Sequence, residues 1–111
     1  MAKQVAERML WAVETLAVEP SDHILEVGCG RGVAVSLVCE KLTDGRITAI
    51  DRSEMMIAMA RKRNREHISA GKAVLKAISL AEADFGDERF DKVFAFHVRE
   101  MWMQPLDGDD A

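Results

Sequence analysis

The 111-residue sequence lacks long apolar runs, and this absence argues against a membrane protein. Its uncharged apolar stretches, such as residues 33–39, are far shorter than the roughly 20 residues needed to span a bilayer. The N-terminus mixes Lys3, Glu7 and Arg8 with apolar residues and has no uninterrupted apolar stretch before a cleavage site, so it is not typical of a secretion signal. We therefore expect a cytoplasmic protein without a membrane partner.

The sequence also has few cysteines and no excess of basic residues. Cys29 and Cys39 are too few for a disulfide framework and are not spaced as a paired metal site, so we expect reduced packing residues and no metal. The net charge of −4 argues against a protein that coats duplex nucleic acid, because such proteins carry a basic excess. The one basic run, residues 61–65, is expected to be a solvated helix face, and nucleic acid is not an expected partner.

The chain has enough apolar sequence for one folded domain. Hydrophobic residues make up 49% and charged residues 31%, which excludes a disordered chain. We expect a single domain over residues 1–111, with an N-terminal helix at 3–18, a core at 22–98 and a tail at 99–111. The tail is expected to be frayed and acidic.

Helical and β-branched segments alternate along the chain, which predicts an α/β Rossmann-like open parallel sheet of about four strands flanked by helices. Helical spacing of apolar residues predicts helices at 3–18, 31–42 and, with Ser53 as N-cap, through about residue 67. Strands are predicted at 23–27, 46–50, 73–78 and 90–98, and a single helical turn at 80–85.

The most informative segment is residues 25–32 (LEVGCGRG), where the first strand meets the next helix. Its glycines permit positive φ angles and let a ligand approach the backbone. In an open parallel sheet this junction lies at the carboxyl edge, where ligands bind. The alternative is a merely tight turn, but three alternating glycines, Gly28, Gly30 and Gly32, are more than such a turn needs. Residues 28–32 are called the glycine turn below.

Asp51 ends the second predicted strand, about 20 residues after the glycine turn. At that offset a carboxylate can accept charge-assisted hydrogen bonds from both ribose hydroxyls. Alone, Asp51 could be a turn or capping residue before Ser53. Together with the glycine turn it indicates a bound nucleoside.

The glycine spacing bears on which nucleoside is bound. A dinucleotide-binding turn has the pattern G-x-G-x-x-G and places a pyrophosphate at the helix N-terminus. Here Val33 stands in place of the third glycine of that pattern. Glu26 also puts an acid beside the turn, which favours a cationic ligand without phosphate. NAD is therefore the second choice.

Residues 25–32, then 49–56 (AIDRSEMM) and 89–93 (RFDKV), resemble class I S-adenosylmethionine-dependent methyltransferases of the small-molecule "methyltransferase domain" group. The resemblance covers most of residues 22–98 and implies the strand order 3-2-1-4, S-adenosylmethionine as cofactor, and methyl transfer to a small-molecule acceptor by in-line displacement. It implies that Glu26 and the turn hold the methionine part, and that Asp51 binds the ribose. The residues implied to bind the methyl donor are Glu26, Gly28, Cys29, Gly30, Asp51, Arg52, Met56, Ser79 and Leu80, with Arg52 and Met56 bordering the adenine.

Two features depart from the family pattern. Alignment on Phe85 puts Ser79 where the family has an acid that contacts the adenine, so Ser79 and Leu80 offer only a hydroxyl and a backbone amide. The family sheet has seven strands, whereas four are predicted here, which would leave strand four as an exposed apolar edge prone to pairing. We expect either a homodimer or the tail around Trp102 to cover that edge. The alternative is a shortened, marginal relative of the family.

The catalytic candidate is His97, which closes the fourth predicted strand at the ligand edge. A neutral imidazole there could take a proton from a hydroxyl or amine acceptor, although a histidine without a partner residue is no catalytic constellation. Methyl transfer needs mainly alignment and exclusion of water, so it requires no dyad or metal. Two other functions stay open: a non-catalytic module that binds the methyl donor or a protein partner, and an NAD-binding oxidoreductase domain.

Overall fold

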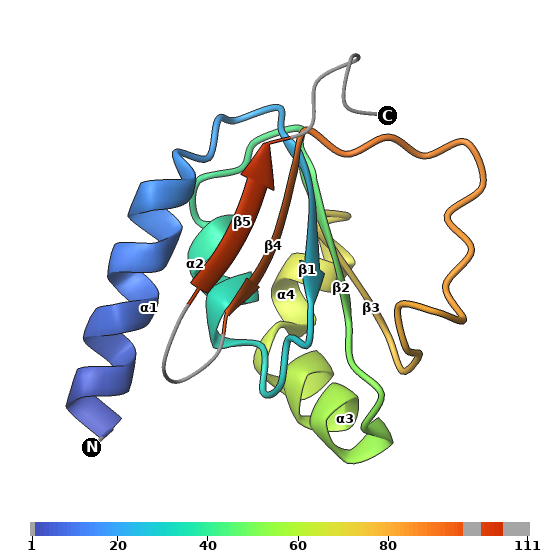
Figure 1. Ribbon diagram of the computed structural model, residues 1–111, viewed down its shortest axis with the longest axis horizontal. Helices are drawn as coiled ribbons and strands as arrows, with labels where there is room; N and C mark the ends of the chain where they lie inside the picture. The colour runs from blue at the N-terminus through green and yellow to red at the C-terminus, as the bar shows by residue number, and fades with distance from the viewer. Residues whose placement is uncertain (1, 97–100, 106–111) are drawn as a thin grey trace.

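The computed structural model describes residues 2–96 and 101–105, which form four helices and one sheet (Figure 1). The elements are α1 (Ala2–Leu16), β1 (His23–Val27), α2 (Val33–Cys39), β2 (Arg46–Ile50), α3 (Glu54–Arg63), α4 (Arg65–Ser69), β3 (Ala73–Lys76), β4 (Lys92–Phe96) and β5 (Met101–Pro105). Among these residues no helix has both the length and the apolar character needed to cross a membrane.

The sheet has the order β3-β2-β1-β4-β5, and its first four strands are parallel. This confirms the predicted fold class and the order 3-2-1-4. In the register, Val27 at the end of β1 lies opposite Ile50 at the end of β2. The residues that follow these two strands, Gly28 and Asp51, therefore emerge side by side at the carboxyl edge of the sheet.

The predicted frayed tail is wrong for residues 101–105, because they form β5 antiparallel to β4. Phe94 lies opposite Met103, and Ala95 lies opposite Trp102. Strand β5 thus supplies backbone partners to the β4 edge, which would otherwise be left unpaired. Of the two expected covers for this edge, the segment around Trp102 occupies it, while a homodimer stays a prediction.

The third sequence motif fixes the start of β4 against β1. The backbone amide of Asp91 donates to the carbonyl of His23 at 2.7 Å, and the carboxylate of Asp91 accepts from the amide of His23 at 2.8 Å. The next residue, Lys92, pairs with the buried Asp22 at 2.6 Å. These contacts account for Asp91 and Lys92 of the motif by sheet assembly.

Three predicted helical segments differ from the structure. The helix expected through residue 67 is divided at Asn64 into α3 and α4. Helix α2 starts only after Gly32, because this residue has a φ of 82° and cannot continue a right-handed helix. Residues 80–85 form no helix. The Ser79 hydroxyl accepts from the amide of Glu82 and closes a local turn instead.

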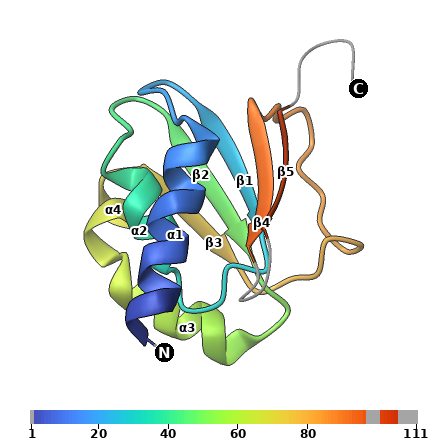
Figure 2. The same cartoon turned by 60° about the vertical axis from the view of Figure 1, so that its left-hand side comes forward.

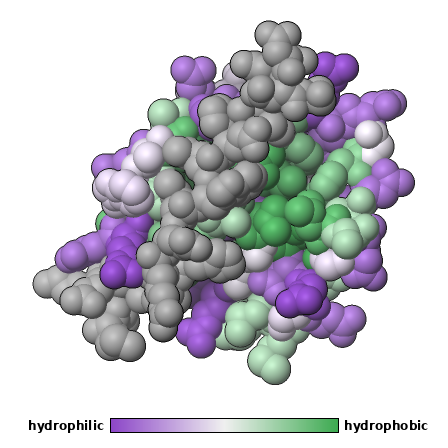
Figure 3. Space-filling model, in the orientation of Figure 1, coloured by the Kyte–Doolittle hydropathy of each residue, from purple (hydrophilic) through white to green (hydrophobic). Residues whose placement is uncertain are grey.

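All four helices lie on one side of the sheet (Figure 2), so the expected helical cover is present on that face only. Residues 77–91, which connect β3 to β4, run on the opposite side without forming a helix or strand. Figure 3 shows hydrophobic side chains gathered over the strands on that side, with hydrophilic residues around them. The sheet face opposite the helices is therefore the less covered one.

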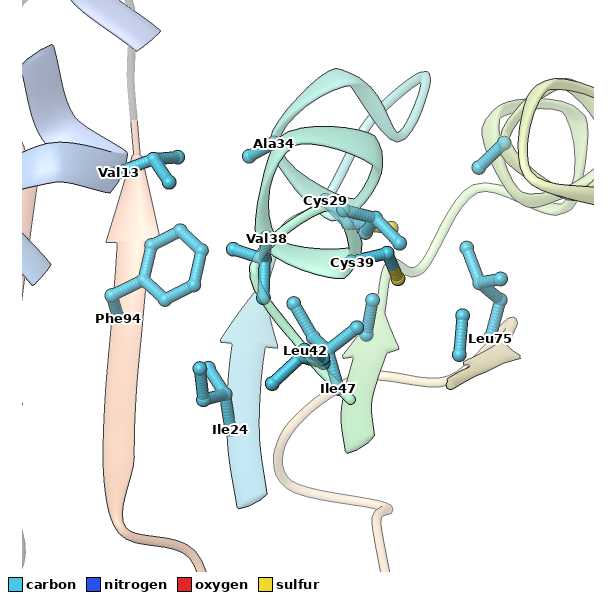
Figure 4. Packing of buried hydrophobic residues seen from close by; sticks show 14 of the residues in the cluster. Val13, Ile24, Cys29, Ala34, Val38, Cys39, Leu42, Ile47, Leu75 and Phe94 are labelled. Atoms are coloured by element: carbon cyan, nitrogen blue, oxygen red, sulfur yellow. The ribbon is translucent and has the colours of Figure 1, made fainter. Parts of the chain in front are cut away.

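The core lies between the sheet and the helices (Figure 4). Ile24, Ile47 and Phe94 project from β1, β2 and β4 toward Val38 of α2, and each of these four side chains is at most 1% exposed. Alternate residues along each strand face this layer, as the two-residue period of a strand requires. The core holds β1, β2 and α2 in fixed relation, and the glycine turn connects two of these elements.

Candidate functional site

The glycine turn is fixed to the end of β2 by backbone hydrogen bonds. The amides of Gly28 and Cys29 both donate to the carbonyl oxygen of Ile50, at 2.8 and 3.0 Å. The amide of Gly32 donates to the carbonyl of Cys29 at 3.0 Å. The turn is therefore part of the sheet framework and is pre-formed at the ligand edge.

Asp51 is bound directly to this turn. One of its carboxylate oxygens accepts from the amide of Gly30 and the other from the amide of Ser53, both at 2.9 Å. A carboxylate offers about four acceptor positions, so these two bonds orient the group and leave capacity for sugar hydroxyls. The expectation that Asp51 and the glycine turn lie together is confirmed, while ribose binding by Asp51 stays a prediction.

Most backbone amides of the glycine turn are already hydrogen-bonded within the protein. The amides of Gly28, Cys29, Gly30 and Gly32 all donate to acceptors within the protein. A pyrophosphate would need free N–H groups at this position. Backbone carbonyls and side-chain carboxylates suit a positively charged ligand instead. The amides of these four residues are therefore not available to a phosphate group.

The three glycines serve two different purposes. Gly28 and Gly30 have φ angles of 76° and 55°, and a Cβ atom on either would meet no other atom within 4 Å. Their open sides leave room for a ligand against the backbone. A Cβ atom on Gly32 would lie 2.7 Å from the side-chain nitrogen of Asn64 and 2.8 Å from the Cβ of Ala60. Gly32 is thus required by packing.

Glu26 is the most unusual titratable residue of the site. Its side chain is only 1% exposed, and its Oε1 atom has no hydrogen-bond partner. Burial, and to a smaller extent the charge of Asp51, raise the pKa of Glu26 to about 8. An unpaired buried carboxyl is costly unless a partner completes it. A ligand with a positive charge and N–H groups would complete it.

The cysteines are buried free thiols, as predicted. Burial, together with the charges of Glu26 and Asp51, raises the pKa of Cys29 to about 12. Burial also raises the pKa of Cys39 to about 11. Both thiols therefore stay protonated near neutral pH and are poor nucleophiles. Cys29 packs into the hydrophobic core.

The remaining candidates are less tightly arranged. Arg52 is exposed, and Met56 is half-buried in the first turn of α3, where its amide donates to the Ser53 hydroxyl at 3.2 Å. Both follow Asp51 closely and lie at the same edge. In the predicted basic run, residues 61–63 are exposed and form the last turn of α3, as a solvated face would. Arg61 departs from this expectation in part, because its guanidinium donates to the carbonyl oxygen of Leu75 in β3 at 2.9 Å. His97 lies outside the described residues.

Sequence reasoning missed Glu82, which lies in the turn after β3. The hydroxyl of Ser79 donates to a carboxylate oxygen of Glu82 at 2.8 Å, and these hydrogen bonds lower the pKa of Glu82. Leu80, in the same turn, is 54% exposed. The turn that lacks the family's acid at Ser79 thus has an acid three residues later. The spacing S-x-x-E, typical of a capping box, could have indicated this contact.

Comparison with known proteins agrees with this geometry. The family model described as "Methyltransferase domain" matches residues 24–108. A putative methyltransferase, YrhH of Bacillus subtilis, is 27% identical over 78% of this chain and 47% of its own. A trans-aconitate 2-methyltransferase of Acidovorax ebreus is 34% identical over 74% of this chain and 29% of its own.

The fold is likewise shared with solved structures. A coclaurine N-methyltransferase bound to N-methylheliamine and SAH aligns with a TM-score of 0.66 at 14% identity, over 80% of this chain and 34% of that protein. The present chain spans less than half the length of the two curated relatives described above. The family match covers most of its residues, from β1 onward. The chain belongs to the methyltransferase domain family.

Proposed function

We propose that this chain binds S-adenosylmethionine and acts in methyl transfer to a small-molecule acceptor. The observation that carries the proposal is the presence of two carboxyl groups at the same edge of the sheet. Glu26 is buried with one oxygen unbonded, and Asp51 is hydrogen-bonded to the glycine turn. Family membership supports the proposal, as does the SAH bound in the coclaurine N-methyltransferase structure. A nucleoside with a cationic methionine tail matches both carboxyl groups.

In this arrangement each residue has a distinct part. Asp51, held by two backbone amides, accepts hydrogen bonds from the ribose hydroxyls. Glu26 faces the positively charged methionine end, and the open sides of Gly28 and Gly30 admit it close to the backbone. Met56 and Arg52 border the adenine. These residues orient the nucleoside and exclude water from part of it.

S-adenosylmethionine, when bound, supplies a methyl group on a positively charged sulfur and so is already activated for in-line displacement. The chain therefore needs to contribute alignment more than acid–base chemistry. A proton released by a hydroxyl or amine acceptor could pass to His97, the proposed base. We further propose a cytoplasmic setting, where the two buried thiols stay reduced.

The test is calorimetric titration of the folded chain with S-adenosylhomocysteine. We expect saturable binding, and we expect Asp51→Ala to weaken it by about 2 kcal/mol, or roughly 30-fold, because charged hydrogen bonds are lost. The control is Asp87→Ala, which removes an exposed carboxylate from the β3–β4 connection and should leave the affinity unchanged.

Two results would overturn the proposal. One is the absence of binding to folded protein, and the other is an affinity that Asp51→Ala leaves unchanged. Saturable binding of NAD in place of S-adenosylhomocysteine would select the oxidoreductase alternative. Binding of S-adenosylhomocysteine without methyl transfer to any acceptor in a panel would select the non-catalytic module.

A further inference from the structure

The junction between α3 and α4 contains a completely buried asparagine. Asn64 is 0% exposed and interrupts a segment whose spacing predicts one continuous helix. Its side-chain nitrogen donates to the carbonyl oxygens of Gly32 and Ala60, each at 3.0 Å. Its side-chain oxygen accepts from the hydroxyl of Ser36 at 2.7 Å. Both donor hydrogens and the acceptor of this amide are therefore used.

These contacts join three elements at one residue of the glycine turn. Gly32 ends the turn, Ser36 lies one helical turn later in α2, and Ala60 belongs to α3. The close approach that leaves no room for a Cβ on Gly32 is made by Asn64 and Ala60. The turn is thus clamped on its inner side by Asn64, while Gly28 and Gly30 keep open sides.

A short series of hydrogen bonds connects Asn64 to Asp51, the residue proposed to bind the ribose. Asn64 donates to the carbonyl of Gly32, whose own amide donates to the carbonyl of Cys29 at 3.0 Å. The next residue, Gly30, donates its amide to Asp51 at 2.9 Å. A displacement of Gly32 would therefore change the path of the turn and the orientation of the Asp51 carboxylate.

Asn64 touches no surface that a nucleoside could reach, because it is buried beneath the turn. A role in stability alone would not require this chemistry, since an apolar side chain fills a buried space without needing three partners. Fully bonded buried amides instead select one arrangement of the backbone around them. We propose that Asn64 is a positioning residue that sets the conformation of the glycine turn and, through it, the placement of Asp51. The proposal rests on the proposed binding of the methyl donor.

The experiment compares Asn64→Ala with Leu42→Ala, a core truncation after α2 that removes no hydrogen bond to the turn. Amide exchange of Gly30 in the ligand-free protein reports its bond to Asp51, and calorimetry with S-adenosylhomocysteine reports binding. Exchange and affinity are measured under conditions in which each variant is folded. We expect Asn64→Ala to increase Gly30 exchange at least tenfold beyond the change in Leu42→Ala. We also expect it to weaken binding five- to tenfold, with unchanged affinity in Leu42→Ala.

If Asn64→Ala does not fold, Asn64→Ser takes its place, because its hydroxyl keeps a donor in the buried space without a buried charge, while the second donor of the amide is lost. Equal Gly30 exchange and equal affinity in the Asn64 and Leu42 variants would overturn the positioning role. Wild-type protein that does not bind S-adenosylhomocysteine, while Gly30 exchange still depends on Asn64, would overturn the proposed function and leave the clamp in place. The two failures are thus distinguishable.

Discussion

Glu26→Gln is expected to make the protein more stable than the wild type at pH 8.5 and about equally stable near pH 4.5. The pKa of Glu26 is raised to about 8 in the folded protein, chiefly by burial, from 4.5. Between these values the folded state binds the extra proton, so the wild type loses stability as the pH rises toward 8. Glutamine stays neutral and avoids that loss. Because one pKa unit corresponds to about 1.4 kcal/mol, the difference should reach a few kcal/mol.

Urea unfolding of both proteins at pH 4.5, 6.5 and 8.5 measures this difference. The control is Glu82→Gln, because hydrogen bonds from Ser79 lower the pKa of Glu82 and the sign reverses. The stability that Glu82 contributes is present above its ordinary pKa and is lost as the pH falls. If the free energies of unfolding of wild type and Glu26→Gln change with pH in parallel, the pKa of Glu26 is not raised in the folded protein and this explanation is wrong.

Gly32→Ala is expected to destabilise the protein by about 3 kcal/mol. An alanine with a left-handed φ costs about 1–2 kcal/mol, and forcing a methyl group into a filled space costs about 1–3 kcal/mol. At Gly32 both apply, since φ is 82° and the new Cβ would lie 2.7 Å from Asn64 and 2.8 Å from Ala60. Neither neighbour can move freely, because Asn64 is buried and hydrogen-bonded and Ala60 is part of α3.

The matched control is Gly71→Ala, because Gly71 has a φ of 78° and no atom within 4 Å of a new Cβ. This variant should lose only about 1 kcal/mol, the cost of the backbone conformation. Chemical denaturation of the two variants isolates the overlap at Gly32. Equal losses would mean that the packing of Asn64 and Ala60 against the turn is loose, contrary to the clamp inferred above.

The parts of the fold set by local sequence were predictable. The first two strands, 23–27 and 46–50, match β1 and β2 because short apolar runs are bounded by turn residues on both sides. The meeting of the glycine turn with Asp51 followed from parallel pairing, which brings strand ends to one edge. Ser53 caps α3 as its residue type predicts.

The parts set by distant contacts were not predictable. Strand β5 ends in a proline and precedes an acidic stretch, so only its pairing with β4 reveals it as a strand. Asn64 lies in an unbroken helical pattern, and its burial depends on Gly32, which is far away in the sequence. The internal use of the turn amides depends on the register of β1 against β2. No local pattern encodes these relations.

The central claim is that the glycine turn and Asp51 hold one nucleoside together, and amide chemical shifts during titration with S-adenosylhomocysteine test it most directly. The account predicts that the amides of Gly28, Gly30 and Ser53 shift saturably with a single Kd, since these groups belong to or contact the turn and Asp51. Unchanged resonances at these three amides, with saturable shifts elsewhere in the chain, would contradict it.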